Sequence, residues 1–106
     1  VGFQPGPREL EEEADGYRFR AGVELAEARR LHGGSRAGAE RYLRMAERDF
    51  ERARQLYEPI QGFSNVNVAL REVDDDDRAR QALNDAWKKP PAKRPRRYSG
   101  RVARWQ

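Results

Sequence analysis

Two rows of alanines spaced seven residues apart constrain the fold of this chain more than any other feature of its sequence. The rows are Ala14, Ala21 and Ala28, followed by Ala39, Ala46 and Ala53. Because seven residues make about two turns of an α-helix, each row falls on one face of its helix. Such small side chains let two helix backbones approach to about 8 Å, the short end of the usual range. The sequence therefore predicts a close-packed helical hairpin.

Local signals predict where both helices of this hairpin begin and end. Pro7 suits the first position of a helix, and Gly33-Gly34 is a stop signal, so the first helix should run from residue 7 to about residue 31. Ser35 is a favourable N-cap for a second helix that ends near Tyr57. The short connection between them makes the two helices antiparallel.

A third helical segment is predicted after Ser64. Apolar residues recur there at the spacing of a helix face, at Val66, Ala69, Leu70 and Val73. Four consecutive aspartates at 74–77 are expected to cap a further helical stretch that reaches Lys89, and Pro90-Pro91 then ends it. The predicted fold class is all-α, an antiparallel alanine-rich helical hairpin plus a third helical segment and an extended basic C-terminal arm. The expected parts are an extended lead-in at 1–6, a helical domain at 7–89 and a basic tail at 90–106.

The first helix carries a second apolar stripe that the hairpin does not use. This stripe contains Phe19, Val23 and Ala26. In so small a domain we expect the third helix to cover it, and an outside protein is the alternative. The candidate residues for contact with protein neighbours are Phe19, Val23, Tyr57 and Trp87.

The composition allows a thin core and offers no catalytic chemistry. Hydrophobic residues make up 37% of the chain and charged residues 38%. No P-loop, nucleophile elbow or dinucleotide fingerprint is present, so we expect neither an enzyme nor a cofactor. The aspartate run lacks the spacing of a calcium-binding loop. His32 has no second histidine or cysteine to complete a metal site, so we expect no metal and place His32 on the surface.

The last nineteen residues differ sharply in charge from the rest of the chain. Residues 88–106 hold eight basic residues and no acidic one, whereas residues 1–87 hold 14 basic and 18 acidic residues. Prolines keep such an arm extended, and its arginines and aromatic rings suit phosphates and unpaired bases. The predicted nucleic-acid-binding residues are Lys88, Lys89, Lys93, Arg94, Arg96, Arg97, Tyr98, Arg101, Arg104 and Trp105. RNA is favoured over DNA, and an acidic protein surface is the alternative ligand.

The leading hypothesis is a non-enzymatic structural subunit of a large nucleoprotein assembly, ribosome-like or a virion. Its hairpin would dock on protein neighbours while its basic tail contacts the backbone of RNA or DNA. The alternative is a helical protein-interaction module, or an accessory subunit of a protein-only complex, whose tail binds an acidic partner surface. No small-molecule substrate is expected in either case.

The sequence gives little information about location. No segment approaches the roughly 18 apolar residues of a membrane span, so we expect no membrane insertion. An intracellular compartment, an organellar matrix and a virion are all compatible with a chain that contains no cysteine. Because the chain starts at Val1 rather than at methionine, we expect that a segment was removed or lies outside this sequence.

Overall fold

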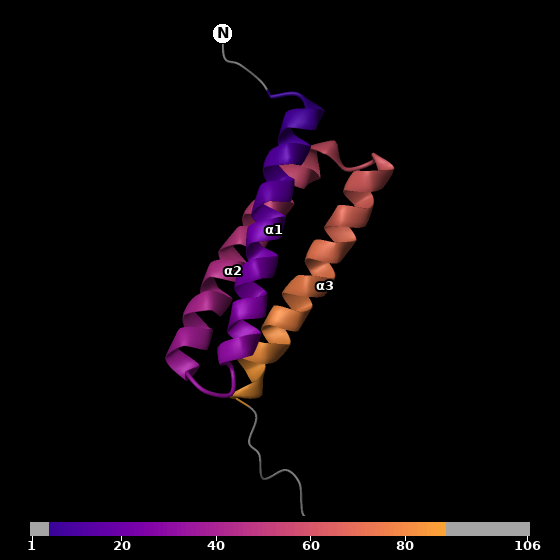
Figure 1. The fold of residues 1–106 in the computed structure, drawn as a ribbon. Helices are drawn as coiled ribbons and strands as arrows, with labels where there is room; N and C mark the ends of the chain where they lie inside the picture. The colour runs from indigo at the N-terminus through magenta and orange to yellow at the C-terminus, as the bar shows by residue number, and fades with distance from the viewer. Residues whose placement is uncertain (1–4, 89–106) are drawn as a thin grey trace, which may run out of the picture.

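The computed structural model describes residues 5–88, which form three α-helices joined by short connections (Figure 1). Helix α1 spans Pro7–Leu31, α2 spans Arg36–Tyr57 and α3 spans Ser64–Ala86, with a single 3-10 turn, η1, at Glu58–Ile60. The chain runs down α1, up α2 and down α3, so α2 is antiparallel to both of its neighbours. Within this part of the chain there is no strand, only an isolated bridge between Gln61 and Phe63. The all-α fold class is thus confirmed.

The predicted ends of α1 and α2 are confirmed because they depend on contacts close in sequence. The Gly6 backbone N–H donates to Glu9 Oε1 at 2.8 Å, and Pro7 follows at the start of α1. Ser35 caps α2 by accepting the Gly38 N–H on its Oγ at 3.1 Å. A Cβ on Gly38 would lie 3.0 Å from that Oγ, so a glycine keeps this turn compact.

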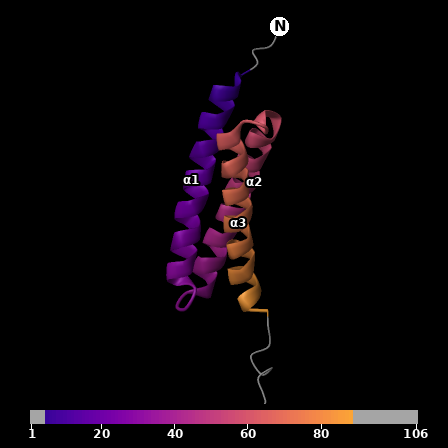
Figure 2. The same ribbon diagram turned by 90° about the vertical axis from the view of Figure 1, so that its right-hand side faces the viewer.

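The alanine rows form the contact between α1 and α2, as predicted. All six alanines are fully buried, at 0% exposure. Larger side chains complete the seam beside them, chiefly Leu25 of α1 and Leu43 and Phe50 of α2. Figure 2 shows the two helices lying side by side along their length. Because alanine keeps the backbones close together, a core with few large residues can still exclude water.

Helix α3 is one continuous helix, so the prediction that the aspartates at 74–77 cap a separate stretch is wrong. These residues lie in the middle of α3 rather than at a helix start. Arginines balance their charge, because Arg54 of α2 reaches both Asp74 and Asp77. Helix α3 begins at Ser64, as predicted, two residues after Gly62, whose φ of 117° is readily adopted only by glycine. The helix ends at Ala86, before the predicted Lys89, which lies outside the described residues.

The expectation that the third helix covers the second stripe of α1 is also wrong. Helix α3 buries Val66 and Val73, and it packs mainly on α2 rather than on α1. Phe19 therefore remains 75% exposed and Val23 54% exposed. The α1–α3 contact includes the ion pair of Arg18 with Glu72 at 2.9 Å.

Three further predictions concern the two ends of the chain and its relation to a membrane. Of the predicted lead-in at 1–6, the structure describes only Pro5 and Gly6, and Gly6 is extended. The predicted tail at 90–106 lies outside the described residues. None of the three helices is long and apolar enough to cross a membrane.

Candidate functional site

Almost all of the predicted nucleic-acid-binding residues lie outside the part of the chain that the structure describes. Only Lys88 is described, and it is exposed, with its Nζ 3.8 Å from Asp85 Oδ1. The other members of this set lie beyond it, at Lys89, Lys93, Arg94, Arg96, Arg97, Tyr98, Arg101, Arg104 and Trp105. The helical body nevertheless presents surfaces of its own, which differ in chemistry.

The first surface is a shallow groove of about 410 Å³ between α1 and α3. Its apolar part consists of Phe19, Val23 and Ala26, the stripe that α3 leaves uncovered. Asp15, Arg18 and Asp76 also line the groove and supply its charged groups. Of the four residues predicted to contact protein neighbours, Phe19 and Val23 are the two that the body exposes together.

Tyr57 belongs to the core, so its predicted role at a protein interface is wrong. The side chain is fully buried, and its hydroxyl donates to Asp15 and accepts from Arg18 Nε at 3.2 Å. Burial, together with the bond to Asp15, raises the pKa of Tyr57 to about 12. Helical spacing explains the position, because Tyr57 follows Phe50 and Ala53 on the face of α2 that meets α1.

His32 and Trp87 close the opposite end of the bundle. Their rings are stacked, with centroids 4.3 Å apart and an interplanar angle of 16°. His32 Nε2 donates to the Leu83 carbonyl at 2.9 Å, and the Arg36 guanidinium lies 5.1 Å from the Trp87 ring centroid. His32 is therefore half-buried, and its predicted surface position is wrong. These contacts tie Trp87 to its own chain, and its part in a protein interface stays a prediction.

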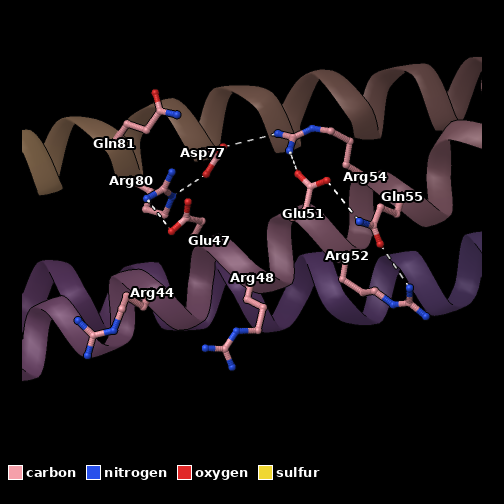
Figure 3. Close-up of a pocket in the computed structure, with 10 residues that line it drawn as sticks. All are labelled: Arg44, Glu47, Arg48, Glu51, Arg52, Arg54, Gln55, Asp77, Arg80 and Gln81. Carbon is pink, nitrogen blue, oxygen red and sulfur yellow. Dashed lines mark hydrogen bonds and ion pairs between the residues drawn. The ribbon is translucent and has the colours of Figure 1, made fainter.

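An ionic network joins α2 to α3 (Figure 3). Arg80 is 6% exposed, and its Nε lies 2.6 Å from Asp77 Oδ1. Arg54 lies 3.6 Å from the same carboxylate and 2.8 Å from Glu51. Asp77 thus forms ion pairs with two arginines, Arg54 of α2 and Arg80 of α3. Among residues 5–88, no group of carboxylates and histidine is arranged to hold a metal ion.

A second surface is a row of four exposed arginines along α2, which we name the arginine row. It consists of Arg41, Arg44, Arg48 and Arg52. Within the described part of the chain, no carboxylate oxygen lies within 4.0 Å of any of their side-chain nitrogens. The sequence-based prediction missed this row, although intervals of three, four and four residues place all four on one helix face.

Two carboxyl groups are buried side by side between α1 and α2. Glu24 is 6% exposed and Asp49 is 9% exposed. Burial and the hydrogen bond with Asp49 raise the pKa of Glu24 from 4.5 to about 7. Arg20 Nη1 lies 3.9 Å from Asp49 Oδ1 and keeps one charge of the pair balanced. This pKa keeps the Glu24 carboxyl group protonated in acid and up to about neutral pH.

No family model, no curated protein and no solved structure is significantly similar to this chain. Function is therefore inferred from the chain's own residues.

Proposed function

We propose that this chain is a non-enzymatic structural subunit of a nucleoprotein assembly, whose helical body contacts protein neighbours and whose basic tail contacts nucleic acid. The observation that carries the proposal is the division of charge along the chain. Residues 89–106 hold seven basic residues and no acidic one, whereas the helical body holds 15 of the 22 basic residues and all 18 acidic ones. A segment of one charge sign attached to a body of the opposite sign is typical of chains that bind polyanions.

The pairing of charges in the helical body strengthens this interpretation. Most arginines of the body lie next to a carboxylate, including Arg18, Arg54 and Arg80. Those arginines are paired within the fold, whereas residues 89–106 hold seven basic residues in a segment that contains no acidic residue of its own. RNA suits the tail better than DNA, because Tyr98 and Trp105 each follow an arginine directly and can stack on unpaired bases.

Removing residues 89–106 tests the role of the tail. We expect the truncated chain to bind single-stranded RNA at least tenfold more weakly, because phosphate contacts supply most of the affinity of such binding. Far-ultraviolet circular dichroism should show the same helical content per folded residue, because α3 ends at Ala86. A matched variant with Lys93, Arg94, Arg96 and Arg97 changed to Gln separates charge from length. Unchanged RNA affinity in both variants would contradict the proposal.

A protein-only assembly is the second candidate, and the exposed groove on α1 favours it. Phe19 is 75% exposed beside Val23, and large apolar side chains exposed together mark sites of protein contact. In that case the tail would bind an acidic partner surface instead of nucleic acid. The ultraviolet absorbance of the native complex distinguishes the two candidates, because only a nucleoprotein shows a 260 nm excess that nuclease removes.

Phe19→Asp tests the groove in either assembly. We expect a change in unfolding free energy of less than about 0.5 kcal/mol, because the side chain is mostly exposed in the isolated chain. Recovery of protein partners with the tagged chain should fall, while RNA affinity should not change. Full partner recovery with the Asp variant would exclude this groove as the docking surface.

A further inference from the structure

The arginine row on α2 stays positive because the carboxylates beside it are held by other arginines. Glu40 pairs with Arg36 at 3.1 Å, Glu51 with Arg54 at 2.8 Å, and Glu47 lies 3.8 Å from Arg80. Each of these three acids thus lies next to a cation outside the row. The body is acidic as a whole, yet the row gathers four arginines without an ion pair on one helix face, with the buried Glu24 near Arg48.

Two side chains of the row, Arg44 and Arg48, lie apart from the ion pairs that join α2 to α3. Figure 3 shows Arg44 and Arg48 without a partner, whereas Arg54 and Arg80 are tied to carboxylates on the side of α2 that faces α3. Arg52 has only a neutral partner, with its Nη1 3.4 Å from Gln55 Oε1. The guanidinium groups are therefore free to bind an external anion without first breaking an ion pair.

An arginine of α1, Arg20, approaches one end of the row, although it also pairs with Asp49 at 3.9 Å. The Arg52 guanidinium lies 5.8 Å from the centroid of the Tyr17 ring, and the Arg20 guanidinium lies 5.3 Å from the same centroid. Contact with an aromatic ring orients a guanidinium and reduces the motion that it would lose on binding. Two arginines from different helices are thus placed at one end of the row.

The chemistry of the row suits a chain of phosphates better than a protein. With a rise of about 1.5 Å per residue, its members lie about 5–6 Å apart along the helix and span about 16 Å. Guanidinium groups bind phosphate oxygens with paired hydrogen bonds. Among residues 5–88, the large hydrophobic side chains that are exposed lie on α1, on α3 and at the turn before α3, so the row lacks the apolar centre typical of a protein interface.

We propose that the arginine row binds the phosphate backbone of RNA, as a second contact that lies on the folded body rather than on the tail. This inference rests on the proposed function and adds to it a specific surface. The row reads no base sequence, because its members are placed to meet phosphates regularly spaced along a strand. The bound strand would lie along α2, where Arg44, Arg48 and Arg52 line one pocket together with residues of α3.

The test uses the full chain with Arg44→Gln and Arg48→Gln together. A control with Arg29→Gln and Arg71→Gln removes the same charge at exposed arginines of α1 and α3 that also lack a carboxylate within 4.0 Å. Fluorescence anisotropy is measured on a labelled single-stranded RNA of about 20 nucleotides, longer than the ~4–16 nucleotides of common single-strand sites. We expect the row variant to bind roughly tenfold more weakly, with a salt slope smaller by about 1.4, and the control to change less than about twofold.

Further measurements distinguish binding by the row from binding by the tail, and RNA from other ligands. Arg44→Lys with Arg48→Lys should keep most of the RNA affinity, because the charge is kept. Thermal melts should show that all variants are folded. If the unaltered chain binds RNA and the row and control variants weaken equally, the row is not a contact and the tail alone explains binding. If the unaltered chain binds no RNA, both proposals fail. Binding to poly-glutamate that depends on the row and exceeds its binding to RNA would identify an acidic protein ligand and overturn the inference.

Discussion

Glu24 is the residue whose ionisation folding changes most clearly. Its side chain is buried beside Asp49, and one of its oxygens has no hydrogen-bond partner among the described residues. Burial, followed by the bond to Asp49, raises the pKa of Glu24 from 4.5 to about 7. A group with a raised pKa in the folded state stabilises the fold fully below its unfolded pKa, and this contribution is lost as the pH rises through the folded value.

Glu24→Gln tests this assignment. The neutral amide resembles the protonated acid, so we expect the variant and the original chain to be similarly stable near pH 4.5. Above pH 7 the variant should be more stable by about 1–3 kcal/mol, because the original must ionise a buried carboxyl group. Urea denaturation across this pH range measures the difference. A constant difference between the two chains at all pH values would contradict the raised pKa.

The seam between α1 and α2 depends on side chains that are small rather than on side chains that are large. Ala46 lies in the middle of the seam with no exposed surface. Ala46→Leu should destabilise the fold by about 2 kcal/mol or more, because the added carbons force the backbones apart. Ala37→Leu on the exposed face of α2 is the matched control and should change stability by less than about 0.5 kcal/mol. Equal melting temperatures for the two variants would show that the helices are not closely packed.

The packing of α3 on α2 depends on the Asp77 carboxylate, which forms ion pairs with two arginines. Asp77→Ala leaves Arg80 almost buried with only Glu47 nearby, at 3.8 Å, and should cost about 3 kcal/mol. Asp75→Ala breaks the exposed pair with Arg78 and should cost less than about 0.5 kcal/mol. Urea denaturation of both variants provides the comparison. A cost for Asp77 no larger than that for Asp75 would mean that this network does not hold α3 in place.

At the scale of the whole molecule, the parts of the fold that could be predicted from the sequence are those set by nearby residues. The alanine rows specify their own faces, and Pro7 and Ser35 act within one turn of their helices. The aspartates at 74–77 misled the prediction, because their local chemistry is that of a helix cap. Their balancing charge comes from Arg54, twenty residues earlier in the chain than Asp74, and only the folded structure brings it near.

The surfaces of the body were predicted less well than its helices, for a similar reason. Whether α3 covers Phe19 depends on the side of the hairpin on which α3 packs. The spacing of apolar residues along the helices does not specify that side. The arginine row can be found from its spacing, but its free charge cannot. That property depends on Glu47 facing Arg80 of α3, and hence on packing between distant segments.

The salt dependence of RNA binding by the intact chain tests most directly whether this protein binds a nucleic-acid backbone. If tail and arginine row both contact phosphates, some six to ten contacts form, and the logarithm of affinity should fall linearly with the logarithm of salt concentration. The expected slope is roughly −4 to −7, at about 0.7 per contact. A slope near zero, or no binding at low salt, would contradict the claim that this chain is built to hold a nucleic-acid backbone.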